Sequence, residues 1–355
     1  MERRLIVFVI LFSIILSVAC FASDTTDALI DALPESLEKY EIDENFLKDS
    51  LSHNFIFESV LNIISTEFKN CTKLFLKILS IIILFSVFNC FGNNKSYNSY
   101  LMSGVVYVSL LTICFPTINS NMELINQTLK SSEVFATASI PVITAVSVSS
   151  GKAFGATVFS AALSLCCTAF QYVADYVLFP VTVILLVFGL VSGFVKDFDV
   201  YSVCTMLKKL IKWIITCFVG IFTTSLSFQN ILSNSSDGVI KKTIQNAVGK
   251  FIPIVGSVLS GAIDEMFALA SLSKVTVSIF GVLIILLLFL PLIIGNLLYG
   301  GVICLCKSVL RFFNAVELNG VMNAISDTFF LYSGICSACA FMLSASYLLL
   351  SIGNS

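Results

Sequence analysis

The stretch VTVSIFGVLIILLLFLPLIIGNLL, Val275–Leu298, carries no charged side chain. It is long enough to cross a bilayer as a helix, because one span needs about 20 apolar residues. Similar runs recur along the chain. Of the 355 residues, 57% are hydrophobic and 12% are charged, whereas a soluble domain carries about 25% charged residues. The composition therefore predicts an all-α, polytopic integral membrane protein built as a helical bundle.

Seven spans are clear and two stretches are ambiguous. The clear spans are Leu74–Phe91, Leu101–Ile118, Ala153–Tyr172, Val177–Val195, Trp213–Phe228, Val275–Leu298 and Phe329–Ile352. The ambiguous stretches are Val134–Ser150, which is short and contains Pro141, and Gly300–Phe313, which contains Lys307 and Arg311. Lys and Arg favour the cytoplasmic side, and a crossing or re-entrant Val134–Ser150 puts the basic loops there. We therefore expect eight spans, with both chain ends outside the cytoplasm.

The N-terminus has the three parts of a signal peptide. Residues 1–22 comprise a basic start at Arg3 and Arg4, an apolar core over Leu5–Val18, and the pattern Cys20-Phe21-Ala22, which predicts cleavage before Ser23. Lipoprotein processing at Cys20 and an uncleaved first span remain alternatives. Residues 23–72 are predicted to form an acidic extracytoplasmic segment of short amphipathic helices.

Residues 73–228 are predicted to hold transmembrane helices, and residues 275–355 the C-terminal ones. Residues 229–274 lie between them and predict an amphipathic extracytoplasmic or interfacial helix kinked at Pro253. One face of that helix consists of small residues, which suits either helix packing or a narrow pore: Gly249, Pro253, Gly256, Ser257, Ser260 and Gly261. An interfacial helix with lysines near lipid headgroups is the alternative.

Two glycine pairs have the spacing that lets helices approach closely in lipid: Gly151-x-x-x-Gly155 and Gly189-x-x-x-Gly193. Such pairs serve either contacts between copies of the chain or packing within one chain. Both interpretations stay open from the sequence.

Signals for catalysis are missing from the sequence. It lacks a Gly-x-x-x-x-Gly-Lys-Ser/Thr phosphate loop and a His-Glu-x-x-His motif, and its one histidine is His53. Cys304-x-Cys306 and Cys336-x-x-Cys339 lie in apolar runs and are interpreted as small hydrophobic residues rather than redox or metal pairs. We expect no catalytic residue, no cofactor and no metal site. The net charge of -2 does not favour nucleic acid as a partner.

The segment Lys242–Ser260, with Phe251-Ile-Pro-Ile-Val-Gly256 at its centre, resembles the stage III sporulation protein AE family. Asn234-Ser-Ser-Asp-Gly238, the apolar Val275–Leu298 and the overall plan of signal peptide, acidic segment and spans carry the same resemblance.

The resemblance implies a non-enzymatic membrane subunit of a channel-like or secretion-like complex that links the mother cell and the forespore in endospore formers. The implied partners are other stage III A-group proteins, including a separate ATPase, the forespore stage II sporulation protein Q, membrane lipid and other copies of this chain. The implied place is the mother-cell membrane around the forespore, and the implied role supports late forespore gene expression. An independent permease for a small neutral solute is the alternative function.

Overall fold

The computed structural model describes the backbone of residues 53–91, 96–149, 164–194, 202–224, 256–312 and 318–352. Side-chain surroundings are described for residues 61–87, 104–140, 164–189, 202–224, 278–310 and 318–348. The predicted signal peptide, most of the acidic segment and residues 225–255 lie outside the described residues. Within the described ones the fold is helical and no strand occurs, which confirms the predicted all-α bundle.

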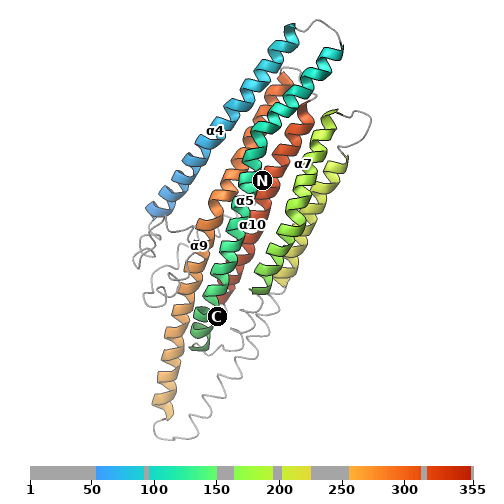
Figure 1. The fold of residues 1–355 in the computed structure, drawn as a ribbon. Helices are drawn as coiled ribbons and strands as arrows, with labels where there is room; N and C mark the ends of the chain where they lie inside the picture. Colours follow the sequence, from blue (N-terminus) through green and yellow to red (C-terminus); the bar gives the residue numbers. More distant parts are fainter. Residues whose placement is uncertain are drawn as a thin grey trace.

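The labelled helices run nearly parallel or antiparallel in one elongated bundle (Figure 1). They are α4 (His53–Phe91), α5 (Ser96–Ser149), the π-helical turn η2 (Ala174–Leu178), α7 (Phe179–Phe194), α9 (Gly256–Phe312) and α10 (Asn319–Ile352). Residues 164–173 lead into η2 as a helix, and residues 202–224 form another helix beside α7. Five of the described helical segments are long and apolar enough to cross a membrane: Leu61–Val87, Gly104–Ile140, Ser164–Gly189, Ser278–Leu310 and Asn319–Leu348.

Helices α9 and α10 form the centre of the bundle. Their apolar windows are 61% and 67% buried inside the protein, whereas the window of α4 is 28% buried. Gly281 of α9 makes room for Tyr347 of α10, since a Cβ at Gly281 would lie 2.3 Å from a carbon of the tyrosine ring. The hydroxyl of Tyr347 forms a 2.6 Å hydrogen bond with Ser139 of α5. Close packing and one buried polar contact thus join three helices.

Two helices are much longer than a bilayer is thick. Helix α9 has 57 residues and α5 has 54, which at 1.5 Å per residue correspond to about 85 Å and 80 Å. The hydrocarbon core of a bilayer measures about 30 Å. Even the apolar window Ser278–Leu310, with 33 residues, spans about 50 Å. Parts of both helices therefore extend beyond the hydrocarbon unless they tilt steeply.

The structure has fewer helix breaks than the sequence predicts. In place of a separate short or re-entrant segment at Val134–Ser150, residues 134–149 continue α5. The polar stretch before them is helical too, and its side chains bond to carbonyls about one turn back, as Asn121 does with Thr117 and Ser132 with Leu129. Polar composition alone therefore does not mark a loop here.

The chain is also helical through the other places where the sequence predicts a break. The ambiguous stretch Gly300–Phe313 continues α9 as far as Phe312, and the expected division at residue 275 falls within the same helix. The short connection expected near Asp175 is the π-helical turn η2, which carries the chain from the preceding helix directly into α7. One extra residue in a turn thus replaces a loop.

Candidate functional site

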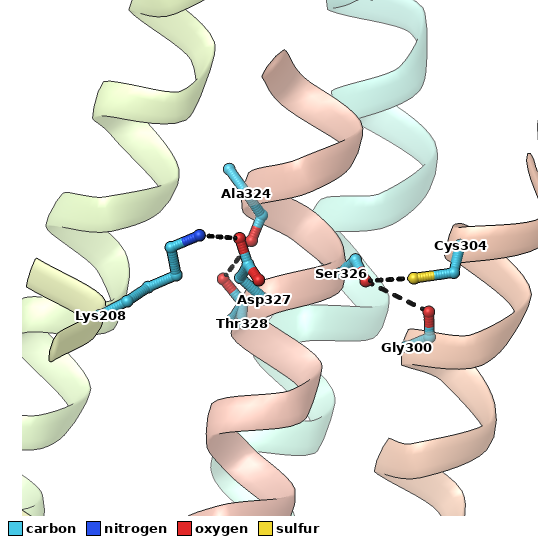
Figure 2. Close-up of polar contacts among 7 residues, drawn as sticks. All are labelled: Lys208, Gly300, Cys304, Ala324, Ser326, Asp327 and Thr328. Atoms are coloured by element: carbon cyan, nitrogen blue, oxygen red, sulfur yellow. Dashed lines mark hydrogen bonds and ion pairs between the residues drawn. The ribbon is translucent and has the colours of Figure 1, made fainter. Parts of the chain in front are cut away.

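An ion pair joins the helix of residues 202–224 to α10 (Figure 2). The Nζ atom of Lys208 lies 2.7 Å from the Oδ2 atom of Asp327, and the two side chains are 23% and 29% exposed. Moving either charge partly out of water costs free energy, and the attraction of the opposite charge at this short distance offsets part of that cost. The pair therefore opposes sliding of the helix of residues 202–224 along α10.

The neighbouring residue on α10 bonds to α9 on the other side. The hydroxyl of Ser326 donates to the carbonyl of Gly300 at 3.3 Å and lies 3.2 Å from the sulfur of Cys304. Figure 2 shows Ser326 and Asp327 pointing in opposite directions from the same turn. Successive residues on a helix point about 100° apart, so one turn can contact two different neighbours.

A third helix contacts the same turn of α10. A Cβ placed on Gly189 of α7 would lie 2.0 Å from the Cβ of Ala324, so the two helices pack at a distance that only glycine permits. We call residues Ala324–Thr328 and their contacts the α10 junction. It brings together α7, α9, α10 and residues 202–224 through one ion pair, the two hydrogen-bond contacts of Ser326, and the close approach of Gly189 to Ala324.

A cleft lies between α4, α5 and α9. Its volume is about 790 Å³. The polar side chains that line it include Glu67, Asn70, Lys73, Lys77, Thr117, Ser120, Asn121, Thr128 and Tyr299. Helix α9 supplies mainly an apolar wall around Pro291. The cleft thus combines charges of both signs and amides with an apolar wall.

Glu67 of α4 rests against the backbone of α9. A Cβ at Gly295 would lie 3.2 Å from the Oε2 atom of Glu67. The carboxylate is half-buried and has no hydrogen-bond or ion-pair partner among the described residues. Glycine at position 295 therefore leaves room for an acidic side chain to which the described residues supply no cation.

Near the cleft, two prolines remove backbone N–H donors from their helices, and the buried Asn296 has a side-chain oxygen without a partner among the described residues. Pro291 and Pro116 both line it, and each lacks the N–H that would bond to the carbonyl four residues earlier in its helix. Asn296 is fully buried and donates to the carbonyl of Leu292 at 2.8 Å, while its own oxygen has no partner in the described structure.

The glycines and serines predicted to form packing or pore-facing surfaces fall in several places. Gly189 lies in the α10 junction, and Gly193 belongs to the last turn of α7. Gly256, Ser257, Ser260 and Gly261 form the first turns of α9, continuous with its apolar window. Gly151, Gly155, Gly249 and Pro253 lie outside the described residues. The packing or pore-facing role of these residues stays a prediction.

Sequence patterns predict neither the α10 junction nor the cleft between α4, α5 and α9. Lys208 lies between the predicted spans Val177–Val195 and Trp213–Phe228, and Asp327 lies two residues before the predicted span Phe329–Ile352. Glu67 was included in the acidic outer segment. A pairing of Lys208 with Asp327, 119 residues apart, depends on tertiary packing that no local spacing encodes.

The cysteines of the described residues are free thiols, and most are buried. Cys306, Cys336 and Cys339 pack in the core as small apolar side chains. Within the side chains that the structure describes, no group of three His, Cys, Asp or Glu residues is arranged to hold a metal ion.

Comparisons with known proteins identify the family. The sequence model of the family described as stage III sporulation protein AE matches residues 39–352. The chain is 23% identical over 286 residues to the stage III sporulation protein AE of Bacillus subtilis (strain 168), covering 73% of this chain and 71% of that relative. No solved structure matches the chain significantly. With most of its length covered by the family model, the chain belongs to the stage III sporulation protein AE family.

Proposed function

We propose that this chain is a non-enzymatic, multi-pass subunit of a secretion-like or channel complex that links the mother cell and the forespore. The observation that carries the proposal is the family match, which extends over residues 39–352. We place the subunit in the mother-cell membrane around the forespore, where it supports late forespore gene expression.

The architecture is compatible with a platform that other subunits contact. Helices of 54 and 57 residues are longer than one hydrocarbon core requires, so they offer surface outside the lipid as well as within it. The polar contacts at the α10 junction hold four helical segments at a fixed level. We propose that energy is supplied by the separate ATPase of the stage III A group and that the forespore contact is made by stage II sporulation protein Q.

Deletion of the gene in its own spore-forming host tests the proposed role. Engulfment, followed with a membrane dye, is expected to finish normally, while a reporter driven by a late forespore promoter is expected to stay silent. The wild-type gene supplied at another chromosomal site should restore the reporter. Normal late transcription and normal spore numbers in the deletion strain would contradict the role.

A liposome experiment separates this role from an independent permease. The purified chain, reconstituted alone, is expected to give no flux of small neutral solutes such as glycerol or sugars above that of protein-free liposomes. Saturable flux by the chain alone, lost on heat denaturation, would favour the permease instead.

A further inference from the structure

Two contacts between α9 and α10 mark out a layer of the bundle that is almost free of charge. At one end Ser326 donates to the carbonyl of Gly300, and at the other Gly281 makes room for Tyr347. Residues 281–300 and 326–347 therefore measure about 29 Å and 32 Å along their helices. Apart from Asp327, beside the first contact, neither stretch carries a charged side chain. Since a hydrocarbon core is about 30 Å thick, we place the membrane along this layer.

Helix α5 crosses the same layer with a polar outer side. Its Ser139 bonds to Tyr347 at one end of the layer, and its part from residue 113 to residue 128 shares the cleft with residues 287–299 of α9. Exposed or half-exposed residues recur on α5 in steps of three and four, so they form one stripe along the helix. We call them the α5 stripe: Ser120, Glu123, Gln127, Lys130, Val134 and Thr137. Five of these six side chains are polar, and the stripe is about 26 Å long.

The charges of the α5 stripe are not neutralised within the described part of the chain. Glu123 accepts a hydrogen bond from Asn119 of the same helix at 3.0 Å, but neither Glu123 nor Lys130 has an ion-pair partner there. Charged side chains at membrane depth nearly always face protein or water. The exposed side chains of α7 and α10 in this layer include apolar ones suited to lipid: Val183, Ile184, Phe330 and Phe341. The α5 side of the bundle therefore differs from the lipid-facing side.

We propose that the α5 stripe lines a water-filled passage through the membrane, closed on its far side by the same stripe of a second copy of this chain. An axis along the membrane normal places each side chain opposite its own equivalent at the same level. Ser120 and Gln127 carry both donors and acceptors, so they bond equally well to water and to their equivalents. Glu123 and Lys130 each meet a like charge, which opposes dry contact and keeps water between the stripes.

The passage extends the channel role proposed above, but the charge distribution alone carries it. Its tests use the purified chain and no sporulating cell. They can therefore fail while the role in sporulation stands, and the reverse holds as well.

Thiol labelling of the full-length chain in liposomes tests the passage. The twelve native cysteines are replaced by alanine, and single cysteines are introduced by Ser120→Cys, Gln127→Cys or Thr137→Cys. A charged maleimide that does not enter lipid, supplied on both sides, should label all three to completion, because the reactive thiolate forms in water. The matched controls Val183→Cys and Phe341→Cys, exposed in the same layer on α7 and α10, should stay unlabelled until detergent dissolves the bilayer.

Cross-linking in the same liposomes tests the second copy. A flexible bis-maleimide should link two differently tagged chains through Gln127→Cys, so that one tag recovers the other, whereas Phe341→Cys should give no linked pair. Labelling of the stripe positions no faster than of Val183→Cys would overturn the passage. Labelled stripe positions in a chain that forms no linked pair would overturn the second copy as its far wall.

Hydroxyl-radical footprinting of the wild-type chain in liposomes decides the question even if the cysteine-free chain does not fold. The radicals form from water, so oxidation reports which exposed side chains water reaches. Two matched pairs compare the α5 side with the lipid-facing side: Leu124 with Leu165, and Val134 with Val183, all exposed. Oxidation is expected at the first member of each pair and not at the second. Equal oxidation within both pairs, or oxidation of the second members alone, would contradict the passage.

Discussion

Replacing Asp327 by Asn should destabilise the bundle through the Lys208 that it leaves behind. The amide keeps the size of the side chain but removes its charge, so the ammonium group of Lys208 loses its partner at 2.7 Å. Exposed ion pairs contribute about 0–1 kcal/mol, while removing one partner of a fully buried pair costs about 3–5 kcal/mol. With the two side chains 23% and 29% exposed, we expect a loss of about 2 kcal/mol in the free energy of unfolding.

A double-mutant cycle separates the pairing from other effects of the substitution. The free energy of unfolding in mixed micelles would be measured for the wild type, Asp327→Asn, Lys208→Gln and the double variant. Because neither single variant retains the pair, the double variant should be less destabilised than the sum of the two, by about 1–2 kcal/mol. The charge exchange Lys208→Asp/Asp327→Lys should recover part of the loss.

Lys209 provides the matched control, since it is adjacent to Lys208 but exposed and without an ion pair in the described structure. Lys209→Gln should change the free energy of unfolding by less than about 0.5 kcal/mol. The reasoning would be refuted if Asp327→Asn cost no more than Lys209→Gln, or if the two single changes at the pair were additive.

Further substitutions test the packing of α7 against α10 and the first turns of α9. Gly189→Ala should lower the free energy of unfolding by about 1–2 kcal/mol, because the new methyl group would lie 2.0 Å from Ala324. Gly220→Ala, on a helix with open space around it, should be neutral or stabilising by up to about 1 kcal/mol; equal effects would show that α7 and α10 are not packed so closely. Gly256→Phe or Ser260→Phe should abolish late forespore transcription while membrane insertion, measured by fractionation, stays normal. Wild-type transcription in both variants would mean that this face contacts only solvent or headgroups.

The general architecture was predictable because apolar composition is a property of each segment by itself. The run Val275–Leu298 identifies a membrane helix without any knowledge of its neighbours, and from Ser278 on it lies in the most apolar candidate span among the described residues. Where helices end was less predictable. The sequence places a break near Asp175 on polarity, and the structure accommodates that residue in a π-helical turn.

The α10 junction and the contact of Glu67 with α9 could not be predicted from the sequence for a related reason. Lys208 and Asp327, and likewise Glu67 and Gly295, are far apart in the chain and come together only when the helices pack. Gly189 was recognised by its spacing, but the spacing does not reveal that its neighbour is Ala324 of α10. A small-residue pattern predicts that another helix packs closely, but the topology of the bundle determines which helix that is.

Affinity purification of the tagged chain from membranes of sporulating cells is the most direct test of the claim that it is one subunit of a larger complex. In a mild detergent, after engulfment, quantitative mass spectrometry is expected to find other stage III A-group proteins, with the separate ATPase among them, enriched over an untagged control strain. Recovery of the chain without any of these proteins, under conditions in which it remains folded, would contradict the claim.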